Sequence, residues 1–127
     1  MKFLGTGSAL PKKVVSNDDL AQVMDTSDEW IRSRTGIGMR YIAVEETTTS
    51  MAVEAAEKAL ADAKISGCEI DLIIAGTISP DYIFPSLACE VQAAIGAKSA
   101  TAFDLSAGCS GFLFALATAD AYFRTGR

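Results

Sequence analysis

The sequence predicts an α/β fold in which helices cover a mixed, mainly parallel sheet. Two observations predict it. Segments with helical periodicity alternate with short, apolar, β-branched segments, and most of the helical segments begin at a capping residue or end near a glycine. Helices that connect successive buried strands are typical of layered α/β proteins. The 127 residues are 50% hydrophobic and 21% charged, a composition that suits a globular domain with an apolar core.

The N-terminal third is predicted to contain one strand and two short helices. In chain order we expect a strand over Lys2–Gly5 and helices over Asp18–Met24 and Ser27–Arg34. Ser16 and Asp19 resemble a capping box in which the Asp replaces the usual Glu. Gly36 follows the second helix, where a left-handed residue is favoured.

The remaining segments alternate helix and strand. We expect a helix over Thr49–Ala63, a strand over Ile70–Thr77, a helix over Ser86–Ile95, a strand over Ala100–Leu105 and a helix over Ser110–Phe123. The Thr49–Ala63 helix has apolar residues at four-residue spacing and charged residues between them. The Gly111–Phe123 stretch is apolar on nearly every side, so we expect it to be buried between layers.

Charge and residue counts exclude several classes of protein. The chain has 11 basic and 16 acidic residues, whereas nucleic-acid-binding proteins usually carry a basic stripe. The absence of histidine excludes a Ser-His-Asp site, a Cys-His site or a His-ligated metal site within these residues. No segment resembles a signal peptide or is apolar for long enough to cross a bilayer. Three widely spaced cysteines give no disulfide framework, so we expect a reduced, cytoplasmic protein.

Cys109 is the strongest candidate for a catalytic residue. It lies between a predicted strand and a predicted helix in Asp104–Phe112 (DLSAGCSGF), which resembles a nucleophile elbow. A thiol at a helix N-terminus meets the positive end of the helix dipole, which favours the nucleophilic thiolate. The alternative is a small buried apolar residue, the commonest environment of a free cysteine. Cys68 and Cys89 lack the glycine turn, and for both we expect an ordinary structural role.

Trp30 is the only tryptophan and is followed by Arg32, Arg34 and Arg40 in an otherwise acidic chain. An indole beside guanidinium groups suits an adenine ring and phosphates, through stacking and charge-assisted hydrogen bonds. The alternative, which composition alone favours, is a core tryptophan with solvated arginines.

The loop Ser79–Pro85 contains two aromatic residues bracketed by prolines. Such a loop suits an apolar pocket or a subunit interface, and composition fits a core-capping loop equally well. Gly5-Thr6-Gly7 lacks the third glycine of a dinucleotide-binding loop, so we expect no such cofactor.

Four segments resemble, in the same order, the β-ketoacyl-acyl-carrier-protein synthase III family. They are Gly5–Ser8 (GTGS), Asp25–Ile37 (DTSDEWIRSRTGI), Phe84–Ser86 (FPS) and the Cys109 elbow. The match spans essentially the whole chain, and the segment around Trp30 separates this family from thiolases and elongating ketosynthases. The resemblance implies a thiolase-like fold of two similar halves, stacked as α-β-α-β-α, in which each half holds a five-stranded mixed sheet.

The resemblance also implies roles for individual residues. Cys109 would take an acyl group from acyl-coenzyme A, expected to be acetyl-coenzyme A, before condensation with malonyl-acyl-carrier protein. Thr26, Trp30 and Arg34 would hold coenzyme A. Phe84 would reach across a homodimer interface to shape the partner's acyl pocket. Coenzyme A thioester is then a substrate, and neither a separate cofactor nor a metal is expected.

The family completes its site with a His and an Asn from its second half, and this chain has no His. Residues 1–127 are therefore expected to supply part of the N-terminal half, leaving a sheet edge and an apolar helix face uncovered. We expect these residues alone to aggregate and to be unable to condense. Two alternatives remain: an acyltransferase or condensing enzyme of secondary metabolism on the same scaffold, or a non-catalytic assembly subunit. An intact Cys109 and Trp30 argue against the assembly subunit, which needs neither.

Overall fold

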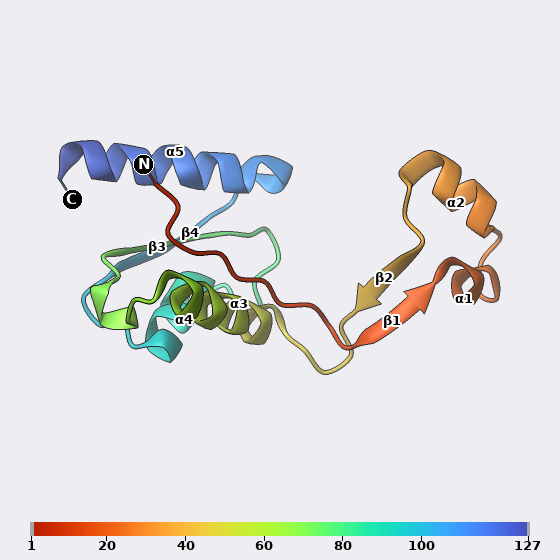
Figure 1. Ribbon diagram of the computed structural model, residues 1–127, viewed down its shortest axis with the longest axis horizontal. Helices are drawn as coiled ribbons and strands as arrows, with labels where there is room; N and C mark the ends of the chain where they lie inside the picture. Colours follow the sequence, from red (N-terminus) through yellow and green to blue (C-terminus); the bar gives the residue numbers. More distant parts are fainter. Residues whose placement is uncertain (1, 127) are drawn as a thin grey trace. The chain divides into compact units, whose positions relative to one another are not determined.

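A computed structural model describes residues 2–126, which divide into two compact units (Figure 1). Residues 10–46 form one unit, called here the α1–α2 unit. Residues 2–9 and 47–126 form the other, called the α3–α5 unit. The two units contain different parts of the predicted site, and each is described by itself.

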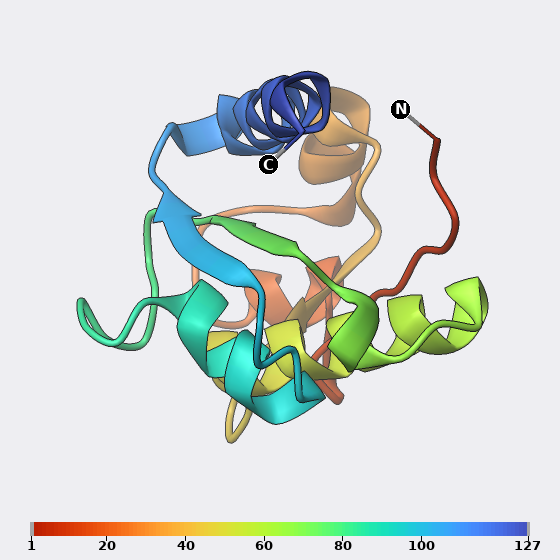
Figure 2. The same ribbon diagram turned by 90° about the vertical axis from the view of Figure 1, so that its left-hand side faces the viewer.

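The α3–α5 unit is a three-layered α/β structure. Its elements are α3 (Thr48–Ala63), the 3₁₀ turn η1 (Gly67–Glu69), β3 (Leu72–Gly76), α4 (Leu87–Ile95), β4 (Thr101–Leu105), the 3₁₀ turn η2 (Gly108–Ser110) and α5 (Gly111–Thr125). The two strands pair in parallel, from Leu72 beside Thr101 to Gly76 beside Leu105. Helix α5 covers one face of this pair, and α3 and α4 lie on the other side (Figures 1 and 2).

Capping residues fix the ends of the helices in this unit. The hydroxyls of Thr47 and Ser86 accept hydrogen bonds from the third backbone N–H of α3 and α4 respectively. Gly96 ends α4 in the left-handed conformation, with φ of 74°. The buried apolar residues of this unit lie on and just after α4 and are Leu87, Ala88, Val91 and Ala97. The core of the unit is therefore small and centred on α4.

The α1–α2 unit combines an antiparallel strand pair with two short helices. Its elements are β1 (Lys13–Ser16), α1 (Asn17–Ala21), α2 (Asp28–Thr35) and β2 (Met39–Ile42). Ser16 and Asp19 form the expected capping box at α1. Ser27 caps α2, which ends at a left-handed Gly36 with φ of 73°. The second predicted helix is confirmed to within one residue at each end.

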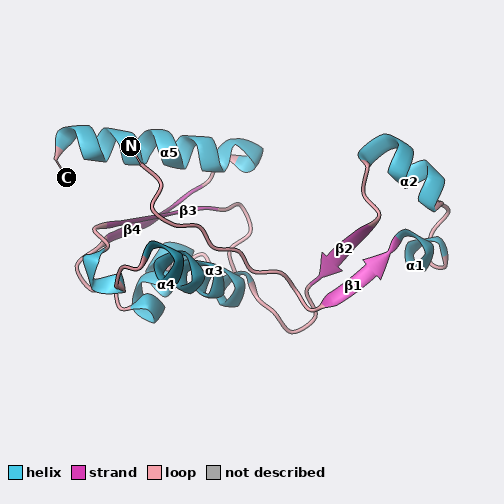
Figure 3. Ribbon diagram, viewed as in Figure 1, coloured by secondary structure: helices cyan, strands magenta, loops and turns pink. Residues whose placement is uncertain are grey.

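Two sequence predictions are wrong, and one pair of strands was missed. Lys2–Gly5 is not a strand, because residues 2–9 run as coil beside α3 with no strand partner (Figure 3). The predicted Asp18–Met24 helix ends at Ala21, because the N–H groups of Val23 and Met24 both turn back to the Leu20 carbonyl. The β1–β2 pair was not predicted, although its apolar and β-branched residues favour strands.

Within the described residues the C-terminal helix is buried on one side only, which differs from the burial that its apolar pattern predicted. Phe112 and Leu113 are each 66% exposed, and Phe123 is 72% exposed. Helix α5 packs on β3 and β4 with one side only, and no described element covers its other side. The uncovered apolar helix face that the family resemblance led us to expect is therefore present.

Candidate active site

Cys109 lies on a turn between β4 and α5, as expected for a nucleophile elbow. It is the middle residue of η2, and its thiol is exposed. Gly108 before it has φ of 52°, a left-handed conformation that side chains other than glycine's disfavour. The N–H groups of Ser110 and Gly111 donate to the Ala107 and Gly108 carbonyls and close the turn. Among the described residues, Cys109 is therefore not buried, in contrast to the alternative interpretation.

Two glycines hold this turn close to the sheet. A Cβ added at Gly76, the last residue of β3, would lie 3.2 Å from the carbonyl carbon of Gly111. The first turn of α5 thus packs directly on the strand backbone at the carboxyl end of the sheet. Thr77 N–H also donates to the Leu105 carbonyl at 3.2 Å, which joins the ends of the two strands. The Cys109 turn is therefore fixed at the edge of the sheet where ligands of α/β proteins usually bind.

Asp104 links the same edge of the sheet to α4. Its carboxylate accepts hydrogen bonds from the N–H groups of Leu87 at 2.9 Å and Ala88 at 2.8 Å. These are donors in the first turn of α4, which have no partner within the helix. Asp104 therefore ties the strand that leads to the Cys109 turn to the most buried helix of the unit.

The Ser79–Pro85 loop is attached to α3 and does not cover the core. The Asp81 carboxylate accepts from Thr49 N–H at 2.7 Å and Thr48 N–H at 3.1 Å. These donors, chiefly Thr49, lower the pKa of Asp81 from 3.8 to about 2. Ile83 and Phe84 are 98% and 88% exposed. The core-capping interpretation of this loop is thus wrong, and its apolar side chains face outward.

Trp30 and Arg34 form an exposed aromatic and cationic pair on α2. The Arg34 guanidinium carbon lies 4.4 Å from the centre of the Trp30 ring. Trp30 is 53% exposed, which excludes the core tryptophan that composition favoured. Thr26 is half-buried just before the N-cap residue Ser27, whose hydroxyl accepts from Trp30 N–H. An indole face with a guanidinium beside it is suited to stacking on a planar ring and to binding phosphate.

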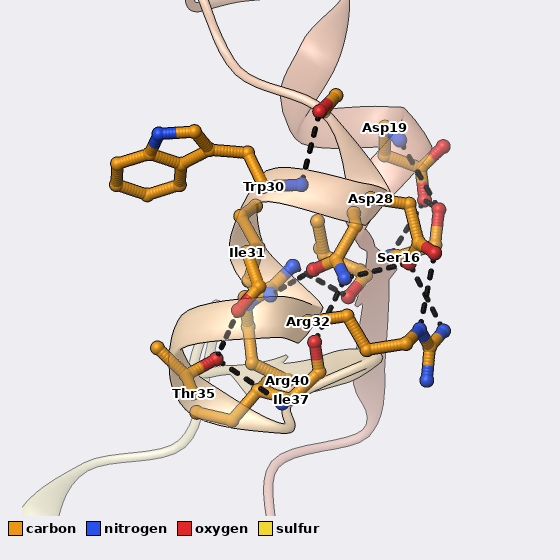
Figure 4. Close-up of polar contacts among 12 residues, drawn as sticks. Ser16, Asp19, Asp28, Trp30, Ile31, Arg32, Thr35, Ile37 and Arg40 are labelled. Atoms are coloured by element: carbon orange, nitrogen blue, oxygen red, sulfur yellow. Dashed lines mark hydrogen bonds and ion pairs between the residues drawn. The ribbon is translucent and has the colours of Figure 1, made fainter.

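The opposite side of α2 is held by a polar network that sequence reasoning missed. Its centre is Asn17, the only asparagine in the chain, which is 1% exposed. Asp28 accepts from Asn17 and from Arg32, whose Nε and Nη2 both lie 3.0 Å from the carboxylate. These bonds, with Arg32 first, lower the pKa of Asp28. Figure 4 shows the Trp30 indole pointing away from Asp28 and Arg32.

The predicted site residues are thus distributed over both units. Trp30 and Arg34 are in contact, with Thr26 nearby in sequence, in the α1–α2 unit. Cys109 and Phe84 belong to the α3–α5 unit. Within residues 2–126, no group of three or more His, Cys, Asp or Glu side chains is arranged to hold a metal ion. Over the same residues, no helix combines the length and the apolar character that a membrane span needs.

Comparison with known proteins shows close relatives along nearly the whole chain. β-Ketoacyl-[acyl-carrier-protein] synthase III 1 of Bacillus anthracis is 57% identical over 98% of this chain and 40% of its own length. The crystal structure of 3-oxoacyl-[acyl-carrier-protein] synthase III from Aquifex aeolicus VF5 is 54% identical, with a TM-score of 0.95. That match covers 98% of this chain and 41% of the solved chain.

A priming β-ketosynthase of the R1128 polyketide pathway is more distant. It is 39% identical, with a TM-score of 0.91, over 95% of this chain and 36% of the solved chain. No protein-family model matches the chain. The chain spans about two fifths of the length of the curated relatives it matches. Its fold is accordingly the corresponding part of the α/β thiolase-like fold, as the sequence predicted.

Proposed function

Because the chain is homologous to β-ketoacyl-acyl-carrier-protein synthase III over nearly all its residues, we propose that it carries the nucleophile of an initiating ketosynthase. In this reaction an acyl group passes from coenzyme A to Cys109 and is then condensed with malonyl-acyl-carrier protein. The observation that carries the proposal is the exposed Cys109 on its glycine turn, within a segment more than half identical to the relatives.

The geometry of the turn supports the proposed acylation step. The Cys109 thiolate attacks the thioester carbonyl, and its negative charge passes to the carbonyl oxygen of a tetrahedral intermediate. The backbone N–H of Cys109, just before the first turn of α5, is suited to donate to that oxygen. The intermediate collapses, the bond to the coenzyme A sulfur breaks, and coenzyme A leaves as its thiolate while Cys109 keeps the acyl group.

The condensation step needs groups beyond this chain. Loss of carbon dioxide from the malonyl group leaves an enolate, which attacks the acyl carbonyl on Cys109 and releases the cysteine thiolate. Stabilising that enolate requires donors near the malonyl thioester. The family resemblance places a His and an Asn there from the second half of the fold. We assign decarboxylation to that remaining part, because these residues contain no histidine.

For coenzyme A we propose the exposed surface of α2. The adenine would stack on Trp30, the phosphates would lie against Arg34, and Thr26 would help to hold the nucleotide. The contact between the Trp30 ring and the Arg34 guanidinium supports this assignment, because it presents a flat apolar face and a positive charge together. Coenzyme A thioester is in this proposal a substrate, and no separate cofactor takes part.

The remaining assignments concern assembly and location. We propose that Phe84 contributes to a homodimer interface and the partner's acyl pocket, supported by its 88% exposure on a loop fixed to α3 by Asp81. We also propose a cytoplasmic enzyme.

A second candidate is a priming condensing enzyme of secondary metabolism. The R1128 ketosynthase favours it, because that protein shares the fold and 39% of the aligned residues. The curated synthase III relatives share 52–59%, so we rank the fatty acid reaction first. Condensation assays with the complete enzyme that compare acetyl-coenzyme A with longer acyl donors distinguish the two.

Mass spectrometry after incubation with acetyl-coenzyme A tests the assignment of the nucleophile. We expect an acetyl group on the Cys109 peptide and none after Cys109→Ser. Cys68→Ser is the matched control, because Cys68 is also exposed but lies on a different turn, and it should leave the adduct in place. Acetylation at Cys68 or Cys89, with Cys109 unmodified, would contradict the proposal.

A further inference from the structure

Asn17 is a buried polar residue at the junction of every element of the α1–α2 unit. It follows the last residue of β1, begins α1, and is 1% exposed. Its backbone N–H donates to the Gly38 carbonyl at 3.3 Å, one residue before β2. A buried polar side chain costs free energy unless it is fully hydrogen-bonded, so a complete set of partners is expected around it.

All the polar atoms of the Asn17 side chain have partners. Its Nδ2 donates to Asp28 Oδ1 and to the Ile37 carbonyl, both at 2.8 Å. Its Oδ1 accepts from Arg40 Nη2, and the same guanidinium donates to the Val15 carbonyl at 3.3 Å. One amide therefore joins the first residue of α2, the turn after α2, and both strands.

These bonds fix the helix that carries the proposed nucleotide surface. Asp28 is the first residue of α2, and Ile37 lies two residues after its end. Asn17 thus holds α2 at both ends, while Trp30 and Arg34 lie between those ends. The Arg34 guanidinium donates only within its own helix, to the Trp30 carbonyl at 3.4 Å, among the contacts of residues 2–126. Among the described residues, the Trp30 and Arg34 side chains have no hydrogen bond to a group outside α2, so the direction of the pair depends on how α2 is anchored.

We propose that Asn17 is a positioning residue for coenzyme A binding, acting through α2 on the Trp30–Arg34 pair. The inference rests on the proposed function, because it takes that pair as the nucleotide surface. An amide is required because Asn17 must donate to a carboxylate and a carbonyl and accept from a guanidinium at once. An aspartate at this position would lose both donors and place a second carboxylate beside Asp28.

The test uses the complete enzyme, because residues 1–127 alone are expected to aggregate. Coenzyme A is titrated against the complete enzyme by isothermal calorimetry, which also measures the Trp30→Ala variant, and near-UV circular dichroism reports how rigidly the aromatic side chains, Trp30 among them, are held. The variants are Asn17→Ala, Asn17→Asp and the exchange Asn17→Asp with Asp28→Asn, which restores an amide-to-carboxylate hydrogen bond. Gln22→Ala is the matched control, because it also removes an amide at the end of α1, but from an exposed residue.

We expect Asn17→Ala to weaken coenzyme A binding roughly tenfold, the cost of leaving buried hydrogen-bonding groups unpaired. The near-UV signal should fall, and the rate of Cys109 acetylation at saturating acetyl-coenzyme A should not change. Asn17→Asp should bind at least as weakly as Asn17→Ala, the exchange should recover part of the affinity, and Gln22→Ala should match the wild type.

Two results overturn the inference, and they are distinguishable from failure of the proposed function. In the first, Asn17→Ala binds coenzyme A within twofold of the wild type while Trp30→Ala abolishes binding. This result refutes the positioning role of Asn17 but supports the nucleotide surface. If Asn17→Ala fails to fold, equal coenzyme A affinity of Asn17→Asp and the exchange variant would likewise refute the role of Asn17 and leave the nucleotide surface in place. Full affinity in Trp30→Ala instead refutes the nucleotide surface itself, and with it the role of Asn17.

Discussion

The two parts of the proposed site are held in place by different kinds of interaction. In the α3–α5 unit, backbone packing positions the Cys109 turn: glycines let α5 approach β3, and the buried residues around α4 are apolar. In the α1–α2 unit, a buried amide and its charged partners position Trp30 and Arg34. The first arrangement is sensitive to added volume, and the second to lost hydrogen bonds.

This difference suits what each part is proposed to do. The attacking atom of a nucleophile must be positioned within a fraction of an ångström relative to the reacting carbonyl. Close backbone packing leaves the residue that carries it few alternative positions. A surface for a nucleotide must present a flat face and a charge, for which a well-anchored exposed helix is sufficient. Substitutions that add volume should therefore affect the α3–α5 unit more strongly, and substitutions that remove polar partners should affect the α1–α2 unit more strongly.

The largest effect is expected from Gly67→Ala in the α3–α5 unit. Gly67 is buried, and a Cβ there would lie 1.8 Å from the Ile95 carbonyl oxygen at the end of α4. Because backbone must move to make room, we expect a loss of about 3 kcal/mol in the free energy of unfolding, measured by urea denaturation followed by circular dichroism.

Gly36→Ala is the matched control in the other unit. A Cβ there has no atom within 4 Å, so only the left-handed backbone, with φ of 73°, opposes the substitution. The expected loss is about 1 kcal/mol. Equal losses for the two variants would contradict the view that close backbone packing dominates the α3–α5 unit.

The next effect is expected from Asp104→Ala. The variant leaves the N–H groups of Leu87 and Ala88 without their acceptor at the part-buried start of α4. We expect a loss of about 2 kcal/mol in unfolding free energy. Asp104→Asn keeps one side-chain oxygen acceptor and should lose about half as much. If Asp104→Asn costs as much as Asp104→Ala, charge rather than the hydrogen bonds holds α4.

Local signals predicted much of this architecture. Helix α4 was predicted from Ser86 and Gly96, and the parallel strands from their β-branched apolar runs, because caps and periodicity act within a few residues. The Cys109 turn was predicted because its glycines are adjacent in sequence. These features depend on neighbours along the chain, which a sequence shows directly.

Features that depend on distant partners were missed or wrong. Asn17 finds its partners at Asp28, Ile37 and Arg40, and its only visible signal was being the single asparagine beside a capping serine. Lys2–Gly5 has strand-like residues but no strand partner among the described residues. Whether a polar residue is buried, or a strand is paired, is decided by tertiary packing that local patterns do not encode.

A smaller effect is expected from Arg34→Ala, which removes the cation beside Trp30. An exposed cation–π contact contributes about 0.5–1 kcal/mol, so stability should change little and coenzyme A affinity should fall by roughly fivefold. Arg34→Lys keeps the charge without the planar stacking, and its coenzyme A affinity should lie between those of the wild type and Arg34→Ala. Isothermal titration with coenzyme A measures all three. Unchanged affinity in Arg34→Ala would restrict the nucleotide surface to Trp30 and Thr26.

The smallest effect on stability is expected from lowering the pH, and it should be similar in the two units. Glu46 in the α1–α2 unit and Asp81 in the α3–α5 unit both have a pKa of about 2, below their ordinary values of 4.5 and 3.8. In each case backbone N–H groups are the chief cause, those of Lys12 and Thr49 respectively. Because the folded pKa is depressed, the stabilisation is present above the ordinary value and is lost as the pH falls through about 2.

Glu46→Gln and Asp81→Asn test this acid dependence. Urea midpoints measured between pH 5 and pH 2 should fall less steeply in each variant than in the wild type. Trp30 fluorescence should report the effect of Glu46→Gln, and far-UV circular dichroism that of Asp81→Asn. Asp81 is exposed, Glu46 is half-buried, and the partners of both carboxylates are backbone groups, so the two slopes should change by similar, small amounts. A change in only one unit would show that the units differ in their electrostatics as well as in their packing.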